Sequence, residues 1–158
     1  MKRRSFVALP ATAALAAPKY KTLTEAEAAI VIALTEAIIP ADKDPGAKEA
    51  GVVQFIDTQL AGPLKRYRPR YRRELPIIDE ACRAATGKPL ALLQLSERTA
   101  FLEQVDKGEI AGGPFFQLIV DHTMQGFYGA PKHGGNRDAA SWKMMGIEKA
   151  MGYHGGHR

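Results

Sequence analysis

The sequence has almost no cysteine, since Cys82 is the single one in 158 residues. One cysteine excludes an internal disulfide, a C-x-x-C zinc site and the C-x-x-C-H motif that attaches c-type haem. The chain is therefore expected to carry no covalently attached haem. We predict that the Cys82 thiol is buried, and pairing with a cysteine of another chain is the alternative.

Sequence motifs of nucleotide binding and of hydrolase chemistry are also missing. Neither G-x-G-x-x-G nor G-x-x-x-x-G-K-[ST] occurs, so the sequence has no nucleotide-binding fingerprint. Ser96, Ser141 and Cys82 lack a nucleophile elbow or a neighbouring base, and the four histidines form no H-E-x-x-H pair. We predict no catalytic, cofactor-binding or metal-binding residue in this chain. His122 is expected to be a hydrogen-bonded residue of the core or of an interface.

An excess of charge of one sign is nearly absent. The formal net charge is +5, and Lys2, Arg3 and Arg4 contribute three of these charges, which leaves +2 for the rest of the chain. Such a small excess does not by itself indicate a nucleic-acid-binding protein. Composition therefore favours an ordinary globular domain without a strongly charged surface.

One basic segment, residues 65–73, combines six Lys or Arg side chains with Tyr67 and Tyr71. Basic and aromatic side chains together can bind phosphates and stack on bases. The tyrosines, however, continue a stripe of residues at helical spacing, which favours a solvated basic face beside a buried tyrosine side. Docking to an acidic surface of a partner is the functional alternative, and a cytoplasmic nucleic-acid module is a further one.

Long hydrophobic runs are absent, and the apolar stretch near the start is too short to span a bilayer. Charged residues 2–4 precede this stretch, which covers residues 6–15, and small residues at 14–17 form a cleavage site. Charged start, apolar stretch and small residues follow each other as in a cleavable export signal. We predict an export signal over residues 1–17 and one helical domain over residues 18–158.

The predicted signal resembles the twin-arginine type, which exports folded proteins. Arg3 and Arg4 are followed by Ser and Phe6, and the apolar stretch is rich in alanine and weakly hydrophobic. Lys2 and Val7 differ from the residues usual in such signals, so an ordinary secretory signal is the alternative. Either type predicts that the protein leaves the cytoplasm, and the twin-arginine type places it in the periplasm.

Hydrophobic spacing predicts an all-α fold, because apolar residues recur at helical intervals and no segment alternates long enough for a strand. We expect a single compact domain of about five helices. From Gly126 the sequence becomes glycine-rich, which predicts a long ordered C-terminal loop. The expected helices are one from the N-cap Thr24, with a Glu27 capping box, to Pro40; one over about 47–60; a segment to about Ala85, kinked or divided by Pro69 and Pro76; one from the N-cap Ser96; and a long one after Gly113-Pro114.

Two blocks of the sequence resemble the gluconate 2-dehydrogenase subunit 3 family. The first lies within residues 23–57 and includes the Leu-Thr start of the first helix and the string A-G-V-V-Q-F-I-D. The second and more specific block is G-F-Y-G-A-P-K-H-G-G-N-R-D at residues 126–138, followed by Trp142 and Gly146. The resemblance covers most of the chain after the signal, and it implies a small accessory subunit without chemistry of its own.

The resemblance also implies partners. The chain would bind a large FAD-containing dehydrogenase that oxidises a sugar or a sugar acid, and a c-type cytochrome subunit with haem c often takes the electrons. The catalytic subunit of such a complex can lack a signal and be exported folded with the small subunit. We therefore expect a non-catalytic subunit needed for assembly, stability and export of the flavoprotein, with no nucleic acid and no membrane span of its own.

The second block also holds the candidate partner interface. Glycine lets two backbones approach closely, and Phe, Tyr, Arg and Trp are residue types of binding hot spots. An ordered loop tied to its own domain is the alternative. The candidate interface residues are Phe127, Tyr128, Gly134, Gly135, Asn136, Arg137 and Trp142.

A function of another class stays open at this point. The chain could be an independent periplasmic metal-binding protein or small enzyme that uses His122, His133 and Asp138. Metal analysis of the isolated chain would separate this alternative from an accessory subunit.

Overall fold

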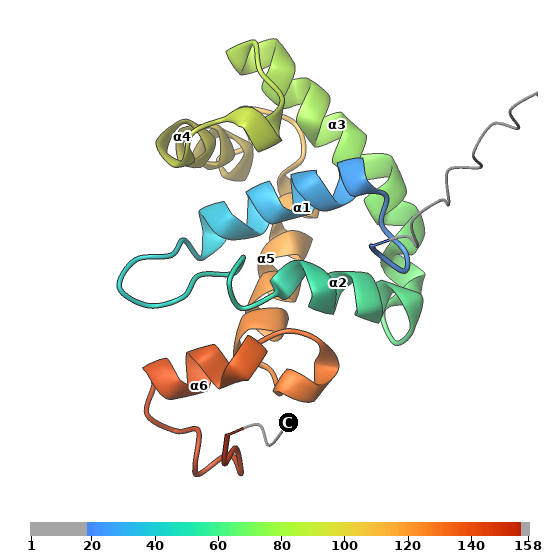
Figure 1. Cartoon of the computed structure of the whole chain (residues 1–158). Coiled ribbons are helices and arrows are strands. Elements are labelled where there is room, and N and C mark those ends of the chain that lie inside the picture. Colours follow the sequence, from blue (N-terminus) through green and yellow to red (C-terminus); the bar gives the residue numbers. More distant parts are fainter. Residues whose placement is uncertain (1–18, 156–158) are drawn as a thin grey trace, which may run out of the picture.

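The computed structural model describes residues 19–155, and all regular structure in this range is helical (Figure 1). The all-α prediction is confirmed, but the described residues contain six α-helices and not five. The predicted export signal at residues 1–17, with Arg3, Arg4 and Phe6, lies outside the described residues. The α-helices are α1 (Glu25–Ile38), α2 (Val52–Ala61), α3 (Arg68–Thr86), α4 (Leu95–Asp106), α5 (Gly113–Tyr128) and α6 (Ala140–Met144).

The glycine-rich C-terminal loop is the second correction. Residues 126–128 still belong to α5, and the segment that follows folds into two 3-10 helices and α6 before it ends in turns. The sequence pattern missed these elements because each is only three to five residues long, too short to show helical periodicity. The four 3-10 helices of the described chain are η1 (Lys65–Tyr67), η2 (Leu90–Leu92), η3 (Pro131–His133) and η4 (Arg137–Ala139).

Helix α1 begins as predicted, with a reciprocal cap at its first turn. The Glu27 amide donates to Thr24 Oγ1 at 3.2 Å, and the Thr24 amide donates to the Glu27 carboxylate at 2.7 Å. This capping box satisfies amides that have no partner within the helix, which typically contributes about 1 kcal/mol. Helix α1 ends at Ile38, just before Pro40. The first predicted helix is therefore confirmed at both ends.

Two predicted helix starts are wrong. Helix α2 begins at Val52 and not near residue 47, because Gly51 has a left-handed backbone (φ 74°) that interrupts the helix there. Helix α4 is capped at Gln94 and not at Ser96, because the Glu97 carboxylate accepts the Gln94 amide at 2.9 Å. This hydrogen bond is the largest cause that lowers the pKa of Glu97.

Helix α3 is continuous, although two prolines were expected to kink or divide it. Pro69 occupies the first turn, where a helix needs no amide donor, and Pro76 lies on the exposed side. The predicted tyrosine stripe is confirmed for Tyr71, which is buried together with Cys82 further along the same helix. Cys82 is fully buried, as predicted, and this burial raises the pKa of its thiol.

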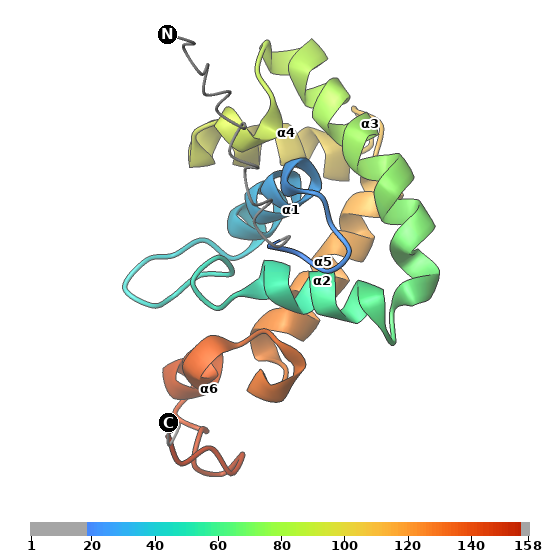
Figure 2. The same ribbon diagram turned by 45° about the vertical axis from the view of Figure 1, so that its right-hand side comes forward.

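The core is built around α1 and α5. Helix α1 packs against α2, α3, α4 and α5, and Figure 2 shows it between these helices. Helix α5 contacts α4 toward one end of the molecule and α6 toward the other (Figure 1). Within residues 19–155, no helix has the length and apolar character needed to cross a membrane. The largest fully buried side chains include Leu34, Ile56, Leu60, Tyr71, Leu75, Phe115, Ile119 and Phe127.

A buried carboxylate joins the start of the described chain to α2. Asp57 accepts the backbone amides of Lys21, Thr22 and Leu23 at 2.7, 2.8 and 2.9 Å. Hydrogen bonds to a charged acceptor are stronger than neutral ones, so these three bonds hold the chain that enters α1. Residues 21–23 are therefore held in a fixed position beside α2.

Candidate functional site

The second family-like block folds into a C-terminal segment, residues 129–146, that is tied to the end of α5 by hydrogen bonds. Asn136 is fully buried, and its side-chain amide donates to the Gly129 carbonyl at 2.8 Å. Its side-chain oxygen accepts the Ser141 amide at 2.9 Å. One asparagine thus joins the residue after α5 to the start of α6, which fixes the path of the intervening chain.

Trp142 makes a second tie to the same end of α5. Its indole nitrogen donates to the Tyr128 carbonyl at 2.9 Å, and only 6% of Trp142 is exposed. The Phe127 ring is buried and meets the Tyr128 ring edge-on, with 4.9 Å between centroids. Trp142 therefore anchors the C-terminal segment at the end of α5, where Phe127 is part of the buried core.

Two glycines allow the C-terminal segment to approach the helices closely. A Cβ atom at Gly135 would overlap the Gly126 carbonyl oxygen, and a Cβ at Gly126 would lie 2.8 Å from the Phe55 ring. In a packed interior, neither the Gly126 backbone nor the Phe55 ring has room to move away. A larger residue at Gly135 or Gly126 is therefore unfavourable. The glycines serve close packing inside the chain at this crossing of α2 and α5.

The backbone of the C-terminal segment is strained around η4. Asn136, Asp138 and Ala139 have left-handed φ values of 44°, 54° and 55°. A left-handed conformation costs a residue with a Cβ roughly 1–2 kcal/mol, and asparagine and aspartate tolerate it best. Ala139 is fully buried despite this cost, and the Arg137 amide donates to the Ala50 carbonyl at 2.9 Å. Packing against the turn before α2 therefore holds the strained backbone in place.

The seven candidate interface residues divide into two groups. Four are buried and make contacts within the domain, and these contacts fit the alternative of a segment tied to its own domain. Three are exposed, and a contact of these with a partner stays a prediction. The buried residues are Phe127, Gly135, Asn136 and Trp142, and the exposed ones are Tyr128, Gly134 and Arg137.

Exposed apolar side chains are the feature that sequence reasoning missed. Apart from Met1, all methionines of the chain lie at or after residue 124, and each exposes more than two fifths of its surface. Methionine is a flexible, adaptable side chain that is enriched at protein interfaces. The concentration of methionine near the C-terminus was a signal that could have indicated this surface. The exposed apolar residues there are Met124, Tyr128, Met144, Met145, Ile147 and Met151.

A cavity of about 410 Å³ lies between the C-terminal segment and the loop before α2. Charged side chains of both signs line it, including Arg137 and Lys143 on one side and Asp44 and Glu49 on the other. A cavity lined by charges of both signs is suited to binding polar groups and not an apolar side chain.

His122 is a core residue, as predicted. Its Nδ1 lies 2.8 Å from the Tyr71 hydroxyl, and the Tyr67 ring meets the imidazole edge-on at 5.1 Å. Burial lowers the pKa of His122 and raises that of Tyr71, which keeps both side chains neutral near pH 7. This pair is a hydrogen-bonded structural contact beneath the basic segment.

The residues of the metal-binding alternative belong to different elements. His122 is buried on α5 beside Tyr71, whereas His133 is exposed on η3 and Asp138 is exposed on η4. Across residues 19–155, no three His, Cys, Asp or Glu side chains are grouped in a way that could hold a metal ion.

The basic segment forms an exposed face, and part of it is neutralised inside the domain. Arg72 donates to both oxygens of the Glu27 carboxylate at 2.7 and 2.9 Å, and Arg68 donates to the Leu60 carbonyl. Tyr67 is half-buried. The prediction of a solvated basic face beside a buried tyrosine is therefore confirmed for Tyr71, whereas Tyr67 is only partly buried.

Fold and site together define an all-helical domain whose C-terminal segment is folded back on α2 and α5. The family model described as gluconate 2-dehydrogenase subunit 3 matches residues 25–148. The chain belongs to this family. No match was found among curated proteins or among solved structures.

Family membership confirms the resemblance seen in the sequence. The matched range runs from the first residue of α1 to a residue beyond α6, so it includes the second family-like block and all of the first except Leu23 and Thr24. The family is that of a subunit of gluconate 2-dehydrogenase, an oxidoreductase complex. This suggests an accessory subunit of a dehydrogenase complex.

Proposed function

We propose that this protein is the non-catalytic small subunit of a periplasmic FAD-dependent dehydrogenase that oxidises a sugar or a sugar acid. The observation that carries the proposal is the family match over residues 25–148. The sequence adds that no nucleotide, hydrolase or metalloprotease motif is present. The FAD and the substrate would then bind to the catalytic subunit.

Electrons leaving the flavin would pass to a c-type cytochrome subunit in this proposal. A c-type haem needs two cysteines for attachment, and this chain has only Cys82. The haem would therefore belong to a third chain. The chain described here would contribute binding surface, through its exposed C-terminal side chains, to assembly and stability of the complex.

Export is the second part of the proposed function. Arg3 and Arg4 in a weakly hydrophobic start support a twin-arginine signal, which carries folded proteins. A catalytic subunit with its flavin already bound could cross the membrane only by such a route. The small subunit would thus supply the export signal for the complex.

The test replaces both arginines by lysine, Arg3→Lys with Arg4→Lys, in cells that produce the whole complex. Flavin-dependent dehydrogenase activity should move from the periplasmic to the cytoplasmic fraction, because the charge is kept but the twin-arginine pair is lost. Lys2→Gln, which changes the charge beside the pair, serves as the control and should leave the activity in the periplasm. Normal periplasmic activity in the double variant would show that the two arginines act only as the basic start of an ordinary signal.

Assembly is tested separately by purifying the tagged chain from the native host. A flavoprotein with bound FAD should co-purify, whereas the isolated chain should show no dye-reducing activity. Recovery as a monomer without a flavoprotein, or with a stoichiometric metal ion, would instead support the independent metal-binding protein or small enzyme.

A further inference from the structure

An open apolar groove lies between α2, α5 and η3. Its volume is about 680 Å³, within the range of roughly 300–1,000 Å³ that is typical of binding sites. Helix α2 contributes the nearly buried Phe55, and helix α5 contributes Met124 and Tyr128, which are 45% and 39% exposed. The residues that line the groove are Phe55, Gln59, Pro63, Met124, Gln125, Tyr128, Gly129 and His133.

The groove is held open by contacts on both sides. The Gln59 side chain of α2 donates to the His133 carbonyl of η3 at 3.2 Å, which joins two of its walls. Below them, the close contact of Gly126 with Phe55 fixes the distance between α5 and α2. A groove whose walls are already fixed loses little conformational freedom when a partner binds.

Two large apolar side chains of α5 face water in this groove. Met124 and Tyr128 are four residues apart, so they lie one above the other on the same helix face. Burying such side chains fully contributes roughly 1.5–3 kcal/mol each, and folding of the described chain leaves much of this surface exposed. Methionine and tyrosine are also enriched at protein interfaces.

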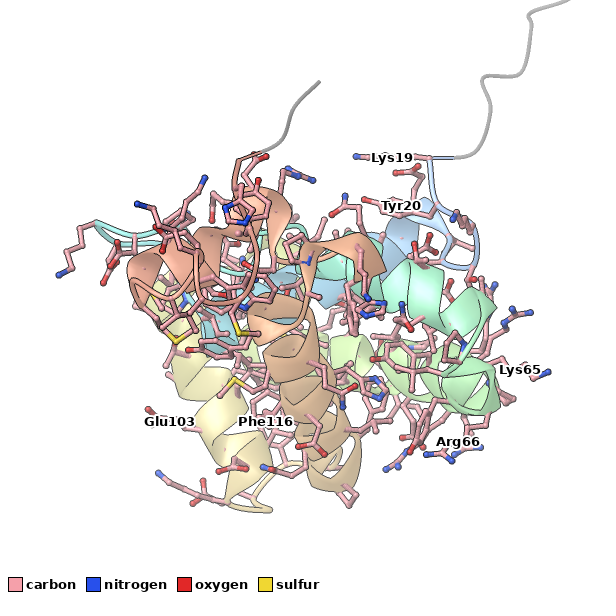
Figure 3. All side chains as sticks on the ribbon, turned by 90° about the horizontal axis from the view of Figure 1, so that it is seen from below. Lys19, Tyr20, Lys65, Arg66, Glu103 and Phe116 are labelled. Atoms are coloured by element: carbon pink, nitrogen blue, oxygen red, sulfur yellow. The ribbon has the colours of Figure 1, made fainter. Side chains whose placement is uncertain are left out.

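A basic rim, Lys65 and Arg66, continues the groove beyond Pro63. Both side chains project away from the domain at the junction of α2 and α3 (Figure 3). Within residues 19–155, neither forms an ion pair with a carboxylate. The Arg66 guanidinium instead lies over the Tyr67 ring at 4.7 Å, so its charge is positioned but not neutralised.

The rim adjoins the groove at Pro63. Pro63 lines the groove, and Lys65 and Arg66 follow it by two and three residues. The Tyr67 ring after Arg66 packs against the buried His122 of α5, which fixes this part of the chain on the domain. Positive charge therefore lies next to the apolar groove. That combination selects a partner in which an apolar side chain stands beside acidic side chains.

We propose that this groove and its basic rim bind a segment of the flavoprotein subunit that carries an aromatic or aliphatic anchor next to acidic residues. The inference rests on the proposed function, because it takes the flavoprotein as the occupant. A second copy of this chain fits less well, since a symmetric dimer through the groove would place two basic rims in one interface.

The test measures binding of the full chain to the FAD-loaded flavoprotein subunit by titration, at low and at physiological salt. Met124→Glu places a charge in the groove at an exposed position and should weaken binding at least tenfold, as expected for a hot spot. Leu92→Glu, at a 70% exposed position on η2, is the matched control and should bind like the unchanged protein.

A second pair of variants tests the basic rim. Lys65→Glu with Arg66→Glu should weaken binding and reverse its salt dependence, because attraction to acidic residues becomes repulsion. Lys43→Glu with Lys107→Glu makes the same charge change at exposed positions elsewhere and should retain normal binding. Circular dichroism and thermal unfolding of every variant confirm that the fold is kept.

Three outcomes would overturn the inference. The first is tight flavoprotein binding by both Met124→Glu and the Lys65→Glu, Arg66→Glu double variant. This result would leave the proposed function intact and place the interface on another surface. The second is a dimer of the chain that Met124→Glu abolishes while flavoprotein binding is unchanged. The third is failure of the unchanged chain to bind any flavoprotein, which alone would also remove the proposed function.

Discussion

The helical core, formed by α1 to α5, and the C-terminal segment, residues 129–146, are held by different forces. In the core, the helices bury apolar side chains against one another, and Leu34, Ile56 and Phe115 have almost no solvent-exposed surface. The C-terminal segment is held by Asn136 and Trp142 hydrogen bonds and by glycine contacts. The core can therefore fold by hydrophobic burial, whereas the C-terminal segment depends on a few polar contacts.

This difference explains where a binding surface can arise. Most large apolar side chains of the core helices are buried, and Met124 and Tyr128 near the end of α5 are exceptions. The C-terminal segment is anchored by the hydrogen bonds of Asn136 and Trp142, and the methionines near it are each more than two fifths exposed. The same stretch of chain therefore contains two sets of residues. One set stabilises the segment, and the other is exposed to a partner.

The largest effect is expected in the core, from Leu34→Ala. Leu34 is fully buried, so the variant loses transfer free energy and leaves a cavity, and the free energy of unfolding should fall by about 2–5 kcal/mol. Denaturant titration measures this change. Leu92→Ala, at a 70% exposed leucine, is the matched control and should change stability by less than about 0.5 kcal/mol. Equal losses in the two variants would contradict the assignment of the core.

The second effect tests whether the C-terminal segment opens separately from the core. Asn136→Ala leaves the Gly129 carbonyl and the Ser141 amide without their buried partner, which costs about 1–3 kcal/mol. Hydrogen exchange should accelerate at the Ser141 amide and in α6, and remain slow in α1. Gln125→Ala, at an exposed position of α5, is the control. Faster exchange throughout the core would show that core and C-terminal segment unfold as one cooperative unit. The proposed difference between the two regions would then be wrong.

The third effect is a pH dependence of stability, which is expected to come from the core residue His122 and not from the C-terminal segment. Burial holds the folded-state pKa of His122 below the unfolded value near 6.5, with Arg66 acting in the same direction and Asp121 opposing it. The unfolded chain then binds more protons between the two pKa values, so stability rises with pH there. His122 should stabilise the fold fully above about pH 6.5 and lose this contribution as pH falls toward the folded pKa.

The measurement is the free energy of unfolding of the unchanged protein and of His122→Gln across pH 5 to 8. The variant should show a shallower fall on acidification, because its residue 122 does not titrate. His133→Gln, at an exposed histidine of η3, should leave the slope unchanged. A slope that depends on His133 and not on His122 would move the pH sensitivity into the C-terminal segment.

The smallest effect is expected from Asp138→Gly. Asp138 is exposed and has a φ of 54°, a conformation that glycine adopts without steric cost. Relief of strain is partly offset by the greater backbone freedom of glycine when unfolded, so stability should rise by at most about 1 kcal/mol. Thermal unfolding is sufficient to detect the sign. A loss of stability would show that the Asp138 side chain makes a stabilising contact.

Much of the core could be predicted from the sequence because its signals are local. Thr24 and Glu27 are three residues apart and cap each other, and Tyr71 and Cys82 share a face with apolar residues at helical spacing. The family-like blocks were also visible as sequence, and the family match confirms them. What failed in the core were boundaries, such as the cap at Gln94, where several residues could begin the helix.

The candidate site could be predicted only in part, because burial there depends on contacts between distant residues. The types Phe, Trp and Asn were read as possible contacts of a partner, yet Phe127, Asn136 and Trp142 are buried inside the domain. Nothing in the local sequence of Trp142 shows that its indole reaches the Tyr128 carbonyl. The groove was missed because Phe55 of α2 is far along the chain from Met124 of α5 and His133 of η3.

The sequence by itself determined the helical class, the main helices, the family and the expectation of export, since each depends on residue types at short spacing. The tertiary structure alone decided which residues of the glycine-rich block are internal anchors and which face water. It also decided that Met124 and Tyr128 line one groove with Pro63, which precedes the exposed Lys65 and Arg66 in the chain. The physical reason is that exposure and charge complementarity are properties of packed helices, and packing joins residues that the sequence keeps apart.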